Sequence, residues 1–171
     1  MQKDVQEIRN RLLAVYHVLR EGDQEKAAAK VKELAEKLVK KEFGIAFCGH
    51  FSAGKSRMIN ALLGEDLLPS SPIPTSANLV RVQRGEEYAK VRFFKGRARK
   101  YLAPYDYDKI KAYCQDGDRI AAIELSRESI GLPEHVVLMD TPGIDSADDA
   151  HRLATESAIH LADLIFYVMD Y

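Results

Sequence analysis

The sequence contains no tryptophan, only two cysteines among 171 residues, and no apolar run that approaches the roughly 20 residues of a membrane-spanning helix. Cys48 and Cys114 lie far apart and fit no metal-ligand spacing, and no two of the five histidines have the spacing of a zinc site. We therefore expect neither a disulfide framework nor a zinc site, and both cysteines suit a reducing compartment.

The sequence also lacks a net charge of one sign, because 25 Lys and Arg residues face 26 Asp and Glu residues. The formal net charge of -1 gives no overall attraction to nucleic acid, and DNA is not an expected partner. The N-terminus opens Met-Gln-Lys-Asp and continues as a charged helical pattern rather than a signal peptide. A cytoplasmic location is expected, with any membrane association peripheral and at the inner face.

The first 42 residues predict an α-helical hairpin. Apolar residues recur at steps of three and four along each half, at Val5, Ile8, Leu12, Val15 and Leu19, then at Ala27, Val31, Leu34 and Leu38. Gly22 is expected to end the first helix and Asp23 to cap the second. Two interpretations remain open: the hairpin packs on the following domain, or its apolar stripe packs against helices from elsewhere in a stalk or neck.

From residue 43 onward, strand and helix patterns alternate. Strands are expected at 43–48, 78–84, 88–94, 135–140 and 164–169, and helices at 55–64, 105–116, 148–162 and, on a weaker pattern, 121–125. Such alternation indicates an α/β fold in which helices cover both faces of a sheet, as in a three-layer sandwich.

Residues 49–56, Gly-His-Phe-Ser-Ala-Gly-Lys-Ser, match the phosphate-binding motif G-x-x-x-x-G-K-S in full, between an expected strand and an expected helix. Glycines let backbone N–H groups approach phosphate oxygens, and the helix start directs its positive dipole end at the same anion. Lys55 adds a charge toward the β- and γ-phosphates, and the Ser56 hydroxyl is expected to ligate Mg²⁺. The nucleotide contacts expected from this segment are Gly49, His50, Phe51, Ser52, Ala53, Gly54, Lys55, Ser56 and Arg57.

Residues 135–143 form a second motif, an apolar strand that ends in Asp140-Thr-Pro-Gly143. In P-loop NTPases, the acid at the end of such a strand holds Mg²⁺. We expect Asp140 to do so through water and the Gly143 N–H to sense the γ-phosphate. A plain Pro-Gly turn is the alternative.

A third motif, Pro-Ile-Pro-Thr-Ser-Ala-Asn, lies between them at 72–78. Nucleotide-sensing loops need a hydroxyl that reaches Mg²⁺ only when the γ-phosphate is present. Thr75 is the expected residue, with Ser70, Ser71 and Ser76 as alternatives by position and a Pro-rich loop without such a role as a further alternative.

With these elements, residues 43–171 resemble dynamin-like GTPases, particularly the bacterial branch, which is also similar to mitofusins. The resemblance rests on Gly-His-Phe-Ser-Ala-Gly-Lys-Ser, on Pro-x-Pro-Thr and on Asp-Thr-Pro-Gly-Ile-Asp-Ser. It implies a P-loop GTPase domain (G-domain) at 43–171, and it makes the hairpin at 1–42 part of a neck or stalk.

The resemblance further implies binding of GTP and GDP with Mg²⁺, and hydrolysis stimulated by the pairing of two GTPase domains. It also implies fusion or fission of an anionic lipid membrane. By motif, catalytic roles fall to Ser52, Lys55 and Thr75, and Mg²⁺ ligation falls to Ser56, Thr75 and Asp140. Ser52 would organise a charge-compensating cation or the catalytic water.

Two features depart from the family pattern. Phe51 occupies the P-loop position at which eukaryotic dynamins have glutamine, and phenylalanine cannot orient a water by hydrogen bonding. The Asn/Thr-Lys-x-Asp-type motif that pairs with guanine does not occur in the sequence, so the phosphate motifs alone do not distinguish GTP from ATP. We therefore expect a truncated domain that binds nucleotide weakly, if at all, on its own.

Residues 81–101 contain eight Lys or Arg residues against two acids, around an expected turn at Gly96. This segment is either a solvated hairpin or a surface for phospholipid headgroups or RNA, of which RNA is the less favoured partner. Two other functions remain as alternatives. One is a small regulatory GTPase of ribosome assembly that contacts RNA through this hairpin, and the other is a non-hydrolysing, nucleotide-gated interaction module.

Overall fold

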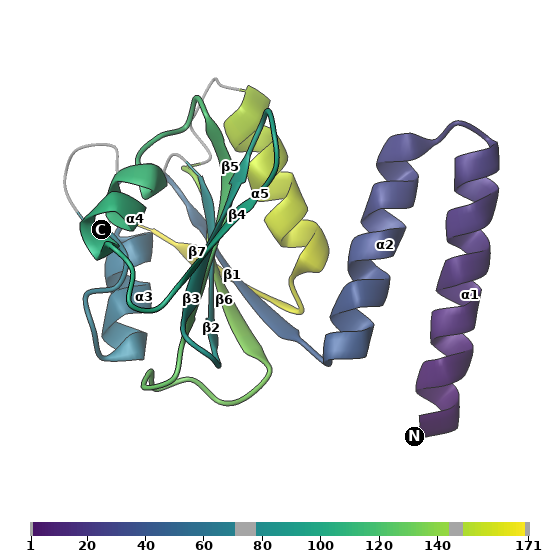
Figure 1. Cartoon of the computed structure of the whole chain (residues 1–171), viewed down its shortest axis with the longest axis horizontal. Helices are drawn as coiled ribbons and strands as arrows, with labels where there is room; N and C mark the ends of the chain where they lie inside the picture. The colour runs from purple at the N-terminus through teal and green to yellow at the C-terminus, as the bar shows by residue number, and fades with distance from the viewer. Residues whose placement is uncertain (1, 71–77, 144–148, 170–171) are drawn as a thin grey trace. The chain divides into compact units, whose positions relative to one another are not determined.

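The computed structural model describes residues 2–70, 78–143 and 149–169 (Figure 1). The chain divides into two compact units, Met1–Glu42 and Phe43–Tyr171. The first unit is a pair of helices, and the second is an α/β domain that contains every described strand.

The first unit consists of α1 (Gln2–Glu21) and α2 (Glu25–Lys40). Gly22 follows α1 directly, as predicted, and its N–H donates to the Val18 carbonyl. The prediction that Asp23 caps α2 is wrong, because the N-cap is Gln24, which makes no side-chain capping bond. Asp23 instead takes a left-handed conformation (φ 56°) in the turn, which aspartate tolerates better than most residues.

The predicted apolar stripe lies only partly between the two helices: Leu12 and Val31 line the groove that the helices form, whereas Ile8 and Val15 are each 48% exposed. A groove of about 460 Å³ follows α1 and α2, and it is lined by Arg9, Leu12, Leu13, Tyr16, Val31, Lys32, Ala35, Glu36, Val39 and Lys40. Ala28 is buried, whereas large side chains such as Val18 and Val39 stay more than half exposed. Two helices of this kind have too few neighbours to bury their own apolar face.

The second unit is built on one seven-stranded sheet with the order β4-β3-β5-β2-β6-β1-β7. The strands are β1 (Phe43–Gly49), β2 (Leu79–Arg84), β3 (Tyr88–Phe93), β4 (Arg99–Leu102), β5 (Ile120–Arg127), β6 (Val136–Asp140) and β7 (Leu164–Val168). The sheet is mixed: β1 runs parallel to both β6 and β7, and β2 runs antiparallel to β6. Neighbouring strands are therefore often distant in sequence.

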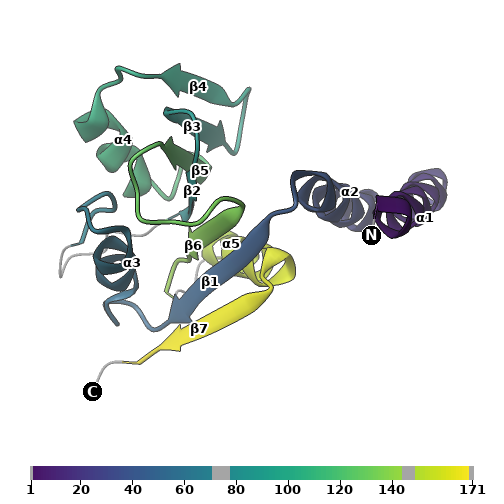
Figure 2. The ribbon, with the colours of Figure 1, turned by 90° about the horizontal axis from the view of Figure 1, so that it is seen from below.

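Helices cover both faces of this sheet, which confirms the predicted three-layer α/β sandwich. α3 (Lys55–Leu63) and α4 (Tyr107–Cys114) lie on one face, and α5 (Asp149–Leu161) lies on the other (Figures 1 and 2). The main core contains the fully buried Phe47, Ile59, Val80, Val82, Val91, Ile110, Ile123, Leu125 and Leu138.

The expectation of a helix at 121–125 is wrong, because these residues lie inside β5. β5 pairs with β2 on one side and β3 on the other, so its backbone hydrogen bonds are satisfied within the sheet. Ile123 and Leu125 face the core while Ala122 and Glu124 are only half-buried, which is the period of a strand. The alanines in this short segment hid that period in the sequence.

Candidate nucleotide-binding site

The phosphate-binding motif occupies the turn between β1 and α3. β1 lies inside the sheet, between β6 and β7, and ends at Gly49, while α3 begins at Lys55. Gly49 has φ 150°, and a Cβ there would lie 2.2 Å from the Val168 carbonyl oxygen, so no side chain fits. Gly54 caps α3 with φ 88°, a left-handed conformation that glycine adopts without strain.

Lys55 points back into this turn. Its side chain is buried, and Nζ donates to the carbonyls of Gly49 (3.2 Å) and His50 (2.7 Å). The ammonium group is thus held against the loop backbone at the N-terminus of α3, where the helix dipole also favours an anion.

Ser56 meets Asp140 directly. The Ser56 hydroxyl donates to Asp140 Oδ2 over 2.6 Å, and both side chains are buried. A hydroxyl and a carboxylate side by side form the hard oxygen donor set that Mg²⁺ prefers, so these residues fit that ion. The structure thus brings together two of the three predicted Mg²⁺ ligands.

The sheet determines where Asp140 lies. Asp140 is the last residue of β6 and pairs with Phe47 of β1 and Val80 of β2. The next residue, Thr141, donates its hydroxyl to the Phe47 carbonyl over 2.8 Å, which ties the end of β6 to β1. The strand end that carries the acid is therefore bound next to the strand that leads into the P-loop.

Gly143 lies against the P-loop itself. A Cβ at this position would stand 2.8 Å from both the backbone N and the Cα of Phe51. Such a distance requires the backbone to move, because real Cβ atoms do not approach backbone atoms so closely. A close approach, rather than an unusual dihedral angle, is the structural reason for glycine here.

The other residues of the predicted site surround this centre. His50, Phe51 and Ser52 are exposed, with Ser52 in a left-handed conformation (φ 60°), while Ala53 is half-buried. Arg57 is exposed on the first turn of α3. The expected switch residue, Thr75, lies outside the described residues.

The thiol of Cys48 lies in β1, one residue before the P-loop. Burial raises the pKa of this thiol above its ordinary value, although a hydrogen bond to Thr141 and the charge of Lys55 oppose the shift. Cys48 therefore stays protonated at neutral pH and acts as a small core residue, as the sequence indicated.

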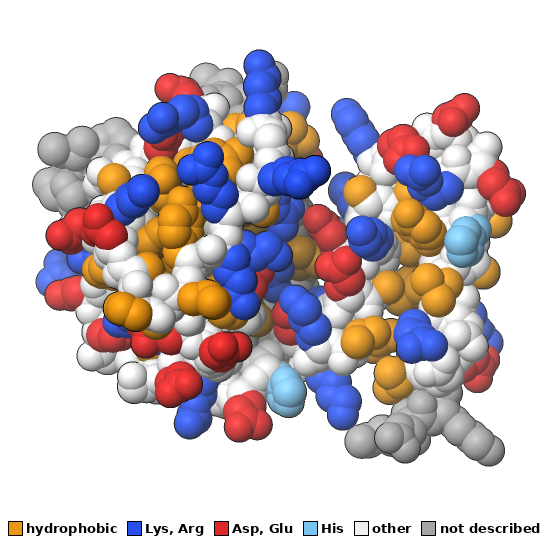
Figure 3. All heavy atoms as spheres, viewed as in Figure 1, with side chains coloured by type: hydrophobic (Ala, Val, Ile, Leu, Met, Phe, Trp, Pro, Cys, Tyr) orange, Lys and Arg blue, Asp and Glu red, His pale blue; other side chains and the backbone are white. Residues whose placement is uncertain are grey.

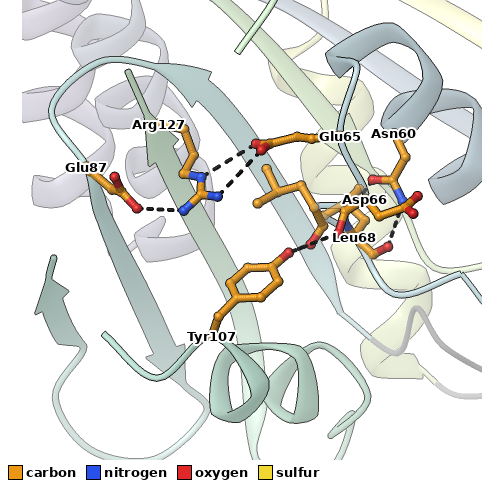
Figure 4. Close-up of polar contacts among 8 residues, drawn as sticks. Asn60, Glu65, Asp66, Leu68, Glu87, Tyr107 and Arg127 are labelled. Carbon is orange, nitrogen blue, oxygen red and sulfur yellow. Dashed lines mark hydrogen bonds and ion pairs between the residues drawn. The ribbon is translucent and has the colours of Figure 1, made fainter. Parts of the chain in front are cut away.

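Sequence reasoning missed the contacts that hold the C-terminal end of α3 (Figure 4). Asn60 is buried and bonds twice to the backbone of Leu68: its Nδ2 donates to the carbonyl (2.7 Å), and its Oδ1 accepts from the N–H (2.8 Å). The Tyr107 hydroxyl, from α4, donates to the Leu67 carbonyl. These bonds hold the chain where it leaves α3, and no local pattern in the sequence signals them.

Arg127 of β5 joins the same region to the turn between β2 and β3 (Figure 4). Its guanidinium bonds to Glu87 at 2.5 Å and to both Glu65 oxygens at 3.5 Å. Burial lowers the pKa of Arg127, but the two carboxylates outweigh burial and raise it above its ordinary value. Burial also raises the pKa of the Tyr107 phenol, which stays a neutral hydrogen-bond donor.

Comparison with models of known protein families matches residues 45–171 to the Dynamin family. The chain belongs to this family. The dynamin-family chain is 43% identical, over 157 residues, to Dynamin-like protein A of Bacillus subtilis, and 30% identical, over 122 residues, to human Mitofusin-2. These alignments cover 92% and 68% of the chain but only 13% and 16% of the two relatives.

A solved structure has the same fold as the dynamin-family chain. It is described as an oligomerised bacterial dynamin pair for long-range sensing and tethering of membranes, and it matches with a TM-score of 0.61 at 25% identity. The match covers 99% of this chain and 34% of that one. Among the described residues of the present chain, no helix combines the length and apolar character that a membrane crossing requires.

Proposed function

We propose that this chain binds the triphosphate of GTP with Mg²⁺, and that the protein to which it belongs hydrolyses GTP. One observation carries the proposal: Ser56, Asp140 and the buried Lys55 lie together at the end of β1. These residues provide the hydroxyl, the carboxylate and the ammonium group that bind a phosphate and its metal ion. Family membership supports guanine as the base, because the phosphate motifs do not choose it.

In this proposal, Lys55 exchanges its bonds to the Gly49 and His50 carbonyls for bonds to phosphate oxygens. Ser56 and Thr75, together with Asp140 through water, would hold Mg²⁺, and this ion would neutralise charge on the phosphates. Thr75 and Ser52 position the water that attacks the γ-phosphate. Catalysis then depends on position and charge, without a covalent intermediate.

We further propose that the whole protein remodels membranes through pairing of its GTPase domains. The relation to a bacterial dynamin pair described as sensing and tethering membranes supports this role. The unit at 1–42 would join other helices in a neck, and its open apolar groove supports that assignment.

The test is calorimetric titration of the 171-residue chain, and of a longer natural protein that carries it, with a non-hydrolysable GTP analogue. We expect the longer protein to bind in a Mg²⁺-dependent way, with a GTP affinity above the ATP affinity, and the 171-residue chain to bind more weakly. Lys55→Ala should weaken binding by roughly 10- to 100-fold, since a charged hydrogen bond contributes about 1.5–3 kcal/mol. Lys109→Ala, at an exposed position of α4, is the matched control. The proposal fails if the longer protein has no Mg²⁺-dependent affinity for any nucleoside triphosphate.

A further inference from the structure

The β3–β4 hairpin, residues 88–102, concentrates positive charge at one edge of the sheet. It contains six cations and no acid, namely Lys90, Arg92, Lys95, Arg97, Arg99 and Lys100. All six are exposed, and none forms an ion pair with a carboxylate of the described residues. We call this segment the basic hairpin.

The pairing of the two strands brings like charges together. Lys90 of β3 lies directly opposite Lys100 of β4, an arrangement that destabilises an antiparallel pair unless other groups compensate. On the other side of β3, Glu124 of β5 pairs in register with Lys90 and also accepts a hydrogen bond from the Tyr88 hydroxyl, so one carboxylate lies beside the two lysines. The basic hairpin thus holds its cations close together without an equal number of carboxylates. This arrangement favours binding of an anion from another molecule.

The basic hairpin also exposes apolar side chains beside its cations. Phe94 is 50% exposed next to the turn at Gly96, and Leu102 is 60% exposed on the edge strand β4. Lys95 and Arg97 flank the same turn. Figure 3 shows Lys and Arg side chains beside hydrophobic ones over the part of the α/β unit that holds β3 and β4 in Figure 1.

We propose that the basic hairpin docks on the surface of a membrane that contains anionic lipid. Cations near such a surface gain attraction from the headgroups, and neighbouring apolar side chains enter the interface between headgroups and acyl chains. Phe94 and Leu102 would enter this interface while the six cations remain among the headgroups. The surface lies outside the nucleotide site, so lipid binding is independent of the proposed GTP binding.

The aromatic side chains favour lipid over RNA. Single-stranded RNA is bound by stacking bases on open aromatic rings. In the basic hairpin, Lys100 lies 4.2 Å from the centroid of the Tyr88 ring, and the Arg99 guanidinium lies 5.4 Å from that of Phe93. Phe94 is the one exposed aromatic residue between positions 88 and 102, all of which the structure describes. A single exposed ring beside a turn suits insertion into a membrane interface better than the stacking of successive bases.

The test is cosedimentation of the nucleotide-free 171-residue chain with phosphatidylcholine vesicles that contain either no phosphatidylserine or about 30% of it. We expect binding only to the anionic vesicles, with a loss at high salt. Lys95→Glu/Arg97→Glu should reduce partitioning by at least about 25-fold, since each cation contributes about fivefold. Phe94→Ser should weaken binding while its salt dependence remains.

The matched control is Lys26→Glu/Lys32→Glu, which gives the same net charge by substitutions at exposed positions of α2, outside the basic hairpin, and should bind like the wild type. Circular dichroism and thermal unfolding establish that each variant folds. If the charge-reversal variant Lys95→Glu/Arg97→Glu does not fold, Lys95→Gln/Arg97→Gln takes its place. An equal loss of vesicle binding in the control and in the hairpin variant overturns the proposal, because net charge alone would then explain binding. Binding of a single-stranded RNA at physiological salt without vesicle binding, or no binding of either, overturns it as well.

Discussion

Ser56 and Asp140 are separated by 84 positions in the sequence, yet a 2.6 Å hydrogen bond joins their side chains. At the residue scale, the site depends on a few such contacts and on glycines that leave no room for a side chain. Gly49 accommodates Val168 of β7, and Gly143 accommodates Phe51 of the P-loop. Each glycine allows two backbone segments to approach more closely than any other residue would permit.

Gly143→Ala tests the close approach to the P-loop. The added Cβ would stand 2.8 Å from Phe51 backbone atoms, so the loop or the turn must shift. We expect a loss of about 1–3 kcal/mol in the free energy of unfolding, as for other overpacked sites, together with weaker nucleotide binding. Chemical denaturation and calorimetry measure the two effects.

Gly131→Ala is the control, because its Cβ would meet its nearest neighbour, the Leu62 carbonyl, at an ordinary 3.6 Å. If both alanine variants were as stable as the wild type and bound nucleotide equally well, the approach of Gly143 to Phe51 would have no role.

At the scale of elements, α3 is held at both ends. Its N-terminus carries Lys55 and Ser56, and its C-terminal part is attached through Asn60 to Leu68. Arg127 links the following Glu65 to the β2–β3 turn. The helix that presents the phosphate-binding groups is therefore attached to its surroundings at both ends, which suits a preorganised site.

Asn60→Ala removes both bonds to Leu68 and leaves a buried N–H and a buried carbonyl without these partners. The expected cost is about 2–6 kcal/mol in the free energy of unfolding, from two groups at about 1–3 kcal/mol each. Urea denaturation measures the change. Asn10→Ala, on an exposed position of α1, should change stability by less than about 0.5 kcal/mol. If Asn60→Ala also lowered the free energy of unfolding by less than about 0.5 kcal/mol, water would be replacing the hydrogen bonds of the side chain.

At the scale of the whole molecule, the two edges of the sheet differ in chemistry. β4 ends the sheet on one side with cations, while β7 ends it on the other with the partly exposed Leu164, Ile165, Phe166 and Tyr167. β7 pairs with β1, and no other described strand bonds to it. Charged edges resist strand pairing between molecules, whereas apolar open edges invite it.

The 171-residue chain should therefore self-associate through β7 as its concentration rises. Ile165→Lys places a charge on this edge strand and should shift the dimerisation constant toward the monomer by about tenfold or more, since lysine is a common protection of edge strands. Sedimentation velocity across a concentration series measures the shift. Val18→Lys, at a more exposed apolar position of α1, is the control. Identical sedimentation of both variants and the wild type would contradict a role for β7.

The sequence by itself determined the parts of this protein that depend on neighbours along the chain. The P-loop is one contiguous segment between a strand and a helix, so its residues and its place between these two elements were readable from residues 49–56. The hairpin helices and most strands followed from local periodicity in the same way. Residues 121–125 did not, because pairing on both sides, rather than propensity, makes β5 a strand.

Only the tertiary structure decided which distant residues meet. The motifs assigned Ser56 and Asp140 to one Mg²⁺ ion, but only the sheet order, which places β6 beside β1, shows how Asp140 reaches Ser56 and Gly143 reaches Phe51. The attachment of Asn60 to Leu68 and the bridges of Arg127 likewise depend on how helices pack against the sheet. The physical reason is that periodicity specifies which face of an element is buried, whereas its partner is selected by the packing of the whole core.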